Sequence, residues 1–409
     1  MIKISKRVSN LEESVTLAIT AKAKALKAEG RDIIGLSAGE PDFDTPENIK
    51  DAAHKAINDG RTKYTPVGGI PELKDAVIER LKLDRGLTYK RSEVLISCGG
   101  KHSIYNLLQA LLDPGDEVII PAPYWVSYPP MVELAGGVPV IITTDDASGF
   151  KVTAEAFKAH ITEKTKAVII NSPSNPTGAV YSKEELTEIA ELALEHDILI
   201  ISDEIYDKLH YDAACKGAPT IATISEKVKA QTVVLNGVSK AYSMTGWRIG
   251  YAAGPEELIG AMMKLQSQST SGASSISQWA AVEALAGPQE AVAIMRDEFH
   301  KRRDLMVSGL NAIDGITCLT PEGAFYVFPN ISGVFGKSGG RSGTEAGEEV
   351  KITDSVSLCT YLLEAAGVAV VPGAAFGQDS NIRLSYACST EDIKEGLARI
   401  EKAVAALKD

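Results

Sequence analysis

Short, continuous apolar runs that alternate with longer amphipathic stretches constrain the fold of this chain more than any other feature. Six such runs are bounded by turn residues: VLIS, EVII, AVII, ILII, TVVL and RIGYAAG. Runs of this kind fit strands that are buried on both faces of a mostly parallel sheet. The stretches between them have helical spacing, and the one at 182–197 begins with the capping pair Ser182 and Glu185. The pattern predicts an α/β fold with helices on both faces of the sheet.

The pattern changes after about residue 295. Residues 298–313 and 390–407 have the apolar spacing of helices. Three short segments are typical of strands in a small separate sheet: AFYVFPNI, VAVVPG and NIRLSYA. Together these segments predict a second, smaller α/β domain. The Gly-rich polar segment 333–351 predicts a mobile surface loop.

Net charge and the distribution of cysteines argue against several classes of protein. The 409 residues carry a net charge of -12 at pH 7, whereas nucleic-acid binding needs a basic surface. No apolar run approaches the roughly 20 residues of a membrane span, and the first residues contain no apolar segment typical of a secretory signal. The five cysteines are scattered without a CxxC pair, which argues against structural zinc and a disulfide framework. We therefore expect a cytoplasmic protein without a metal ion.

Glycines and polar side chains follow several apolar runs, at the end of a parallel sheet where ligands bind. Gly99 and Gly100 precede a helix, Trp125 follows EVIIPAPY, Asp203 ends ILIIS, and Lys240 follows TVVLNGVS. Singly, they have ordinary explanations: a tight turn for the glycines, a helix cap for the aspartate and a surface charge for the lysine. Together they predict a pocket with a backbone anion cradle, a flat ring, an anion and a cation.

Lys240 and Arg248 indicate the chemistry of this pocket. An ammonium group near an apolar wall is disfavoured, so we expect the pKa of Lys240 to fall below its usual value of about 10.4. A neutral amine is what a Schiff base requires. The planar fork of Arg248 suits a phosphate. A Schiff-base lysine, a phosphate cradle and an acid for a pyridine nitrogen together indicate pyridoxal phosphate as the cofactor.

Seven motifs, in order, extend this interpretation over nearly the whole chain. They are LSAGEPDFDTP, TKYTPVGGIPELKDAV, DPGDEVIIPAPYWVSYP, NSPSNPTGAVYS, SDEIYD, GVSKAYSMTGWRIGY and GAFYVFP. With these motifs the chain resembles the fold-type I, class I aminotransferases of the aspartate aminotransferase kind, and most of all the bacterial branch that includes aspartate/prephenate aminotransferases. The resemblance implies a three-layer α/β fold with a mostly parallel seven-stranded sheet and a smaller α/β domain built from both chain ends. It implies an N-terminal arm with part of the small domain (1–44), a large cofactor-binding domain (45–295) and a small C-terminal domain (296–409).

The resemblance also implies roles for individual residues. It implies three catalytic residues: Lys240 forms the imine with the cofactor, Asp203 pairs with the pyridinium nitrogen, and Tyr206 hydrogen-bonds the phenolic oxygen. The other cofactor-binding residues that it implies are Gly99, Gly100, Lys101, Trp125, Asn175, Ser239, Arg248 and, from the neighbouring subunit of a homodimer with shared active sites, Tyr64. Arg383 is implied as the clamp of the substrate α-carboxylate, and the other implied substrate-binding residues are Gly39, Lys101, Trp125 and Asn175.

The implied reaction is a ping-pong transfer of the amino group of aspartate to 2-oxoglutarate, which gives oxaloacetate and glutamate, with prephenate or aromatic keto acids as side substrates. Animal-type relatives bind the distal carboxylate with an arginine in the segment that corresponds to 266–280, but this segment contains no arginine or lysine. We therefore assign the distal carboxylate to Lys101. Two positions depart from the family: Gly237 stands where many relatives have a serine, and Glu12 stands where the bacterial branch has a basic residue. The acid at position 12 argues against prephenate.

Two other classes of protein share parts of this pattern. A pyridoxal-phosphate-dependent carbon–sulfur β-lyase, or a cyclopropane-forming synthase, uses the same fold and lysine on neutral substrates. A ligand-sensing regulator combines an aminotransferase-like domain with a basic DNA-binding module, for which this acidic chain gives no sign.

Overall fold

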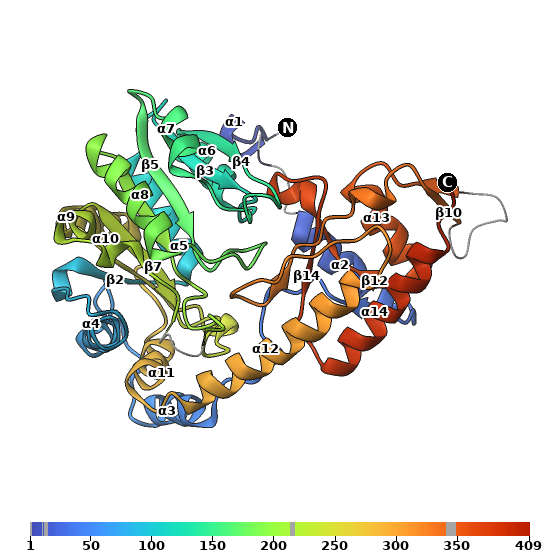
Figure 1. The fold of residues 1–409 in the computed structure, drawn as a ribbon. Helices are drawn as coiled ribbons and strands as arrows, with labels where there is room; N and C mark the ends of the chain where they lie inside the picture. Colours follow the sequence, from blue (N-terminus) through green and yellow to red (C-terminus); the bar gives the residue numbers. More distant parts are fainter. Residues whose placement is uncertain (1, 10, 12–14, 213–216, 341–348) are drawn as a thin grey trace.

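The central sheet of the computed structural model has seven strands in the order β2-β8-β7-β6-β5-β3-β4 (Figure 1). Residues 2–9, 11, 15–212, 217–340 and 349–409 are described. The strands are β2 (Val94–Ser97), β3 (Glu117–Ala122), β4 (Val138–Thr143), β5 (Thr165–Asn171), β6 (Leu199–Asp203), β7 (Thr232–Gly237) and β8 (Gly250–Ala253). β8 is antiparallel to both its neighbours, and the pairs from β7 to β4 are parallel. The predicted mostly parallel sheet is confirmed; the apolar runs do not reveal β4, an edge strand that contains Pro139.

Helices cover both faces of this sheet because consecutive strand residues point to opposite sides. In β6, Ile200 packs in one hydrophobic cluster and Ile201 in another on the opposite face. One face is covered by α5 (Gly100–Leu111), α6 (Tyr128–Leu134) and α10 (Glu256–Ser269). The other face is covered by α4 (Pro71–Arg85), α7 (Ala154–Ala159), α8 (Lys183–Glu195), α9 (Glu226–Ala230) and α11 (Ser275–Ala286), and α3 (Glu47–Asn58) packs against α11.

The start of α8 follows the predicted capping signal. The hydroxyl of Ser182 accepts the N–H of Glu185 at 3.2 Å, and the Glu185 carboxylate accepts the N–H of Ser182 at 2.7 Å. This reciprocal pair satisfies two donors that a helix start leaves open. Short 3₁₀ turns are η1 (Arg91–Glu93), η2 (Ile221–Thr223), η3 (Thr245–Trp247), η4 (Ser332–Val334) and η6 (Gly373–Phe376), and η5 (Leu362–Ala366) is a π-helical turn.

A second body contains residues from both ends of the chain (Figure 1). The predicted small sheet is confirmed as β13 (Val371–Pro372), β14 (Ile382–Ser385) and β9 (Tyr326–Val327), in that order. β1 (Ile34–Gly35) pairs in parallel with β12 (Val368–Ala369), so the N-terminal segment joins the C-terminal core. The helices of this body are α2 (Val15–Ala28), α12 (Glu290–Asn311), α13 (Ser355–Tyr361) and α14 (Thr390–Ala405). The domain bounds 44/45 and 295/296 remain predictions.

The segment predicted as a mobile loop contains ordered structure in its described part. β10 (Ser338–Gly340) and β11 (Glu349–Lys351) form an antiparallel pair, which corrects the prediction for these residues. Gly339 lies so close to Tyr361 that a Cβ atom there would come within 2.7 Å of its ring. The glycine therefore serves packing against α13 here. Residues 341–348 lie outside the described residues.

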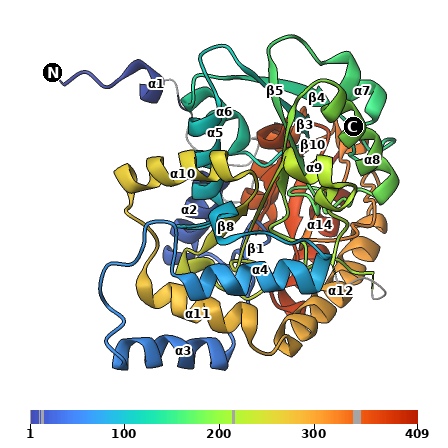
Figure 2. The ribbon, with the colours of Figure 1, turned by 90° about the vertical axis from the view of Figure 1, so that its left-hand side faces the viewer.

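The N-terminal residues project from the body next to α6, as α1 (Lys6–Ser9) shows (Figure 2). Glu12, on which the argument against prephenate depends, lies outside the described residues. Among the described helices, none combines the length and apolar character that a membrane span needs. The described residues also contain no cluster of three or more His, Cys, Asp or Glu side chains that could hold a metal ion.

Candidate active site

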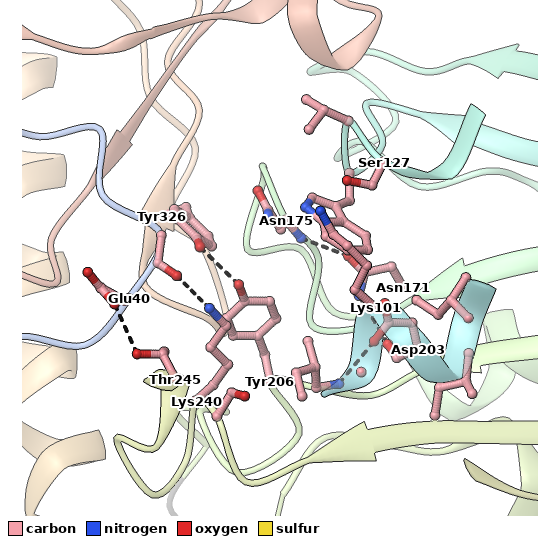
Figure 3. Close-up of a pocket in the computed structure, with 18 of the residues that line it drawn as sticks. Glu40, Lys101, Ser127, Asn171, Asn175, Asp203, Tyr206, Lys240, Thr245 and Tyr326 are labelled. Carbon is pink, nitrogen blue, oxygen red and sulfur yellow. Dashed lines mark hydrogen bonds between the residues drawn. The ribbon is translucent and has the colours of Figure 1, made fainter. Parts of the chain in front are cut away.

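A cavity of about 550 Å³ lies at the carboxyl ends of the central strands, between the sheet and the second body. Residues after β5, β6 and β7 form one side of it, and Tyr326 of the small sheet lies on the other (Figure 3). Arg383 of the small sheet also lines the cavity. The candidate residues from the sequence that line it are Gly39, Gly100, Lys101, Trp125, Asn175, Asp203, Tyr206, Ser239, Lys240, Arg248 and Arg383. The fold thus gathers most of the predicted site from segments far apart in the sequence.

Two candidate residues are not among the residues that line this cavity. Gly99 lies directly before Gly100 and caps α5, where it contacts Arg248. Tyr64 has a fully exposed side chain in a loop and borders a separate hollow of about 400 Å³ with residues 270–275. A role for Tyr64 in a neighbouring subunit therefore remains a prediction.

Lys240 follows β7 and extends its amine toward the second body. Its Nζ atom donates a hydrogen bond to the carbonyl oxygen of Gly39 (Figure 3). Burial, together with the charges of Arg383 and Arg248, lowers the pKa of Lys240 to about 8, although the carboxylates of Glu40 and Asp203 oppose this shift. The lowered pKa predicted from the sequence is confirmed. The neutral amine of Lys240, a nucleophile, is therefore accessible near neutral pH.

Asp203 ends β6 as a buried carboxylate, 5% exposed. Oδ2 accepts the hydroxyl proton of Tyr128 at 2.6 Å, and Oδ1 accepts the N–H of Ile205 at 3.2 Å. Burial raises the pKa of Asp203, and these two hydrogen bonds and the charge of Lys240 oppose that rise. Residues 205–208 form a turn, so the alternative of a cap for a helix over these residues is wrong. The buried carboxylate therefore offers its charge to the cavity.

Arg383 lies in β14, the middle strand of the small sheet, and is 4% exposed. The alternative of a strand-edge charge is therefore wrong. Its Nη1 donates to Oδ1 of Asn175 at 3.0 Å and its Nη2 to the carbonyl oxygen of Ser37 at 2.8 Å. Within the described part of the chain its buried Nε has no hydrogen-bond partner. A buried guanidinium with no carboxylate bonded to it favours an anionic ligand.

Tyr206 and Asn175 lie on the cavity wall near Lys240 and Arg383. The hydroxyl of Tyr206 is 2.9 Å from the hydroxyl of Tyr326 (Figure 3). The N–H of Asn175 donates to Oδ1 of Asn171 at 2.8 Å, and its Oδ1 holds Arg383. Asn175 thus orients the guanidinium and also lines the cavity. The sequence interpretation did not assign Tyr326 a role, although it lies within the quoted motif GAFYVFP.

An anion cradle forms where Gly99 meets Arg248. Gly99 has a φ of 92°, and a Cβ atom there would lie 2.3 Å from Nη2 of Arg248. Nη1 of Arg248 donates to the carbonyl oxygen of Thr245 at 2.8 Å, which fixes the fork beside the N-terminus of α5.

Packing explains why a glycine stands at position 237, one of the two departures from the family. A Cβ atom added there would lie 2.9 Å from the carbonyl oxygen of Ile249. A serine at position 237 does not fit without a shift of β8.

Trp125, Tyr128 and Lys101 form the remaining wall. The rings of Trp125 and Tyr128 meet edge to face with centroids 5.3 Å apart, and Nζ of Lys101 lies 4.8 Å from the Trp125 ring centroid. Burial lowers the pKa of Lys101, and the charge of Arg248 lowers it further. Tyr128 therefore touches both the predicted stacking ring and Asp203. The position of Tyr128 three residues after Trp125 is the signal in the sequence that could have identified it as a site residue.

Comparisons with known proteins agree with this geometry. The family model "Aminotransferase class I and II" matches residues 31–400. The chain is 54% identical over 408 residues to the aspartate/prephenate aminotransferase of Cereibacter sphaeroides, with 100% of each chain covered. Two solved structures resemble it: the aspartate aminotransferase of Rhizobium meliloti (TM-score 0.94, 48% identity, 100% of each chain) and that of Thermus thermophilus with maleate (TM-score 0.90, 44% identity, 98% of this chain and 100% of that chain).

The fold and the site define a lysine-dependent enzyme with a three-layer α/β architecture. The chain belongs to the class I and II aminotransferases, whose cofactor is pyridoxal phosphate. The residues present fit this cofactor. The cradle at Gly99 and Arg248 suits its phosphate, the buried carboxylate of Asp203 suits a cationic ring nitrogen, and the amine of Lys240 suits its aldehyde.

We expect the Tyr128→Phe variant to fold and to transfer amino groups more slowly. The change removes the hydrogen bond to Oδ2 of Asp203, which helps to keep the pKa of this carboxyl down. A hydrogen bond to a charged group contributes about 1.5–3 kcal/mol, so kcat should fall by about ten- to a hundredfold. Steady-state kinetics at saturating cofactor measure the effect. An unchanged kcat would contradict a role for this contact.

Proposed function

We propose that the protein transfers the amino group of aspartate to 2-oxoglutarate and releases oxaloacetate and glutamate in alternating half-reactions. The observation that carries this proposal is that the cavity is lined by two cationic side chains besides Lys240 and Arg248. These are the buried Arg383 and, on α5, Lys101. A dicarboxylic amino acid needs two such positions. The two solved structures are named aspartate aminotransferases, the Cereibacter relative is named an aspartate/prephenate aminotransferase, and the Thermus structure contains the dicarboxylate maleate.

Each residue contributes a separate part of this reaction. Pyridoxal phosphate, when bound, supplies the carbonyl carbon that receives the amino group and a ring that takes up electrons from the bond broken at Cα. Lys240 would hold the cofactor, and as a free amine it would move the α-proton of the substrate as general acid and base. Asp203 would favour the protonated form of the ring nitrogen, and Arg383 would orient the substrate by its α-carboxylate.

Lys101 is the proposed reader of the distal carboxylate. It lies in the first turn of α5, directly after the glycines of the anion cradle, so its backbone is fixed beside the cavity. Its ammonium lies over Trp125, the ring expected to stack on the cofactor. A lysine in the first turn of a helix gains nothing from the helix dipole. An anionic ligand in the cavity explains its place.

We expect the Lys101→Ser variant to lose specificity for dicarboxylates. A hydrogen bond to a charged group contributes about 1.5–3 kcal/mol, so kcat/KM for aspartate should fall by about ten- to a hundredfold. The value for alanine or phenylalanine should barely change, and the Lys101→Arg variant, which keeps the charge, should retain much of the activity on aspartate. Equal losses on all substrates would show that Lys101 serves the cofactor alone.

A homodimer with shared sites is part of the same proposal. The fully exposed Tyr64 and the exposed apolar side chains of Met263 and Leu265 on α10 support it. Burial of apolar side chains in a subunit interface is favourable. Light scattering on purified protein measures the mass in solution; a monomer of 43.5 kDa would contradict the proposal. A cytoplasmic location and activity on prephenate or aromatic keto acids stay predictions.

Incubation of the cofactor-loaded protein with a panel of amino acids tests the function. The absorbance of the lysine-bound cofactor should be lost with aspartate and glutamate at much lower concentrations than with alanine or phenylalanine. Cystathionine serves as the control for carbon–sulfur cleavage. Release of pyruvate and ammonia from cystathionine, with no change for aspartate, would show a β-lyase instead.

A further inference from the structure

Glu40 is an acidic side chain at the mouth of a cavity whose other charged residues are mostly cationic. Four cationic residues line the cavity, namely Lys101, Lys240, Arg248 and Arg383, against two acidic ones, Asp203 and Glu40. Asp203 lies at the buried end of the cavity, and pairing with the ring nitrogen of the cofactor would explain an acidic residue there. Both proposed substrates have two carboxylates and a net negative charge, so a carboxylate at the mouth disfavours their entry unless it has another role.

Several contacts fix Glu40 next to Lys240. Its Oε2 accepts the hydroxyl proton of Thr245 at 2.9 Å, and the preceding carbonyl, that of Gly39, accepts a hydrogen bond from Nζ of Lys240. Figure 3 shows Glu40 and Asp203 on opposite sides of Lys240. The segment is held further on by Arg302, whose Nη1 donates to Oδ1 of Asp42 at 2.8 Å. Glu40 is therefore an exposed side chain in a fixed place.

The charge of Glu40 acts where the substrate amine must arrive. The charged groups that influence the pKa of Lys240 are Glu40, Arg383, Arg248 and Asp203, and Glu40 has the largest effect among them. The nitrogen of an amino-acid substrate would have to enter the region where Nζ of Lys240 lies. An amino acid brings an α-ammonium group into this field, and a keto acid brings no positive charge.

We propose that Glu40 is a specificity-determining residue that favours the amino-acid form of a substrate over its keto-acid form. The proposal rests on the aminotransferase function stated above. The carboxylate attracts the α-ammonium group during binding and repels the keto acid, which carries only negative charge. It thereby offsets part of the advantage that the surrounding cations give to keto acids. Thr245 holds the carboxylate in place.

The Glu40→Gln variant tests this role, since the amide oxygen can still accept the hydrogen bond of Thr245 while the charge is lost. The dissociation constant of 2-methylaspartate, which has an ammonium group but no α-proton, should rise about fivefold, the upper range of an exposed ion pair. The constant of maleate, which has no ammonium group, should stay the same or fall. Both are measured by absorbance titration of the cofactor-loaded protein, without turnover.

The Thr245→Val variant is the matched control because it keeps the charge of Glu40 and removes the hydroxyl. It should retain more than half of the preference for 2-methylaspartate over maleate. A loss as large as in Glu40→Gln would show that the hydrogen bond matters and the charge does not. An unchanged ratio of the two constants in Glu40→Gln would also overturn the proposal.

The KM values of alanine and pyruvate in the two half-reactions separate this proposal from the choice of substrate. If the protein prefers another amino acid to aspartate, Glu40→Gln should still raise KM for alanine and not for pyruvate. Equal increases for both compounds would contradict the role of Glu40, whatever the preferred substrate is.

Discussion

The Lys240→Ala variant should bind pyridoxal phosphate and form no covalent bond with it. The contacts expected for phosphate, ring and ring nitrogen lie on other residues, among them Arg248, Trp125 and Asp203. Loss of the general acid and base should alone lower kcat by about 10²- to 10⁴-fold. Reduction with borohydride, followed by mass spectrometry of the peptides, locates any cofactor that is attached to a lysine.

The Lys101→Ala variant is the matched control for this experiment. It removes the other lysine that lines the cavity, and borohydride should still attach the cofactor to Lys240 in it. In Lys240→Ala, we expect no reduced adduct at all. A stoichiometric adduct on another lysine of that variant would contradict the assignment.

The Asp203→Asn variant should fold normally and turn over slowly. Its carboxylate acts mainly on charge that develops during the reaction, so its loss removes stabilisation of the transition state. Removal of one such electrostatic group elsewhere costs about 10²- to 10³-fold in kcat, and we expect a loss at least that large. Kinetics at constant cofactor occupancy measure it. Near-normal turnover would reduce Asp203 to a structural residue.

Asp197→Asn is the matched control for this substitution. Asp197 precedes the opposite end of β6, is exposed, and has a φ of 55°, which asparagine also tolerates. Its replacement should leave kcat unchanged.

The melting temperature of the Asp203→Asn variant shows whether the substitution has damaged the fold. Because burial raises the pKa of Asp203, its carboxylate costs folding free energy at pH values above that pKa, and the cost shrinks as the pH falls from there toward the ordinary pKa of an aspartate. At pH 7 the cofactor-free Asp203→Asn protein should therefore melt no lower than the cofactor-free parent. A lower melting temperature would mean that loss of activity reflects damage to the fold.

The parts of the fold that could be predicted from sequence are those that local pattern determines. β6 and β7 are continuous apolar runs because both of their faces are buried, and the helix at α8 carries its own start signal in Ser182 and Glu185. The pKa of Lys240 could be anticipated for the same reason, since an apolar run leads directly to the lysine.

Contacts between distant segments could not be predicted in this way. Asn175 and Arg383 are 208 residues apart, and their hydrogen bond depends on how the small sheet packs against the large one. The glycine at position 237 looks like the loss of a phosphate ligand until the packing of β8 against it is known. The pair of β10 and β11 escaped prediction because Gly339, in a Gly-rich stretch that normally marks a loop, serves close packing against Tyr361.

Transfer of ¹⁵N-labelled aspartate nitrogen tests the central claim most directly. The cofactor-loaded protein is mixed with ¹⁵N-aspartate and unlabelled 2-oxoglutarate, and the products are followed by NMR while both concentrations are varied. We expect ¹⁵N-glutamate and oxaloacetate in equal amounts, no free ¹⁵N-ammonia, and the parallel double-reciprocal lines of a ping-pong reaction. Label in ammonia without glutamate, or no transfer from aspartate to 2-oxoglutarate, would contradict the account.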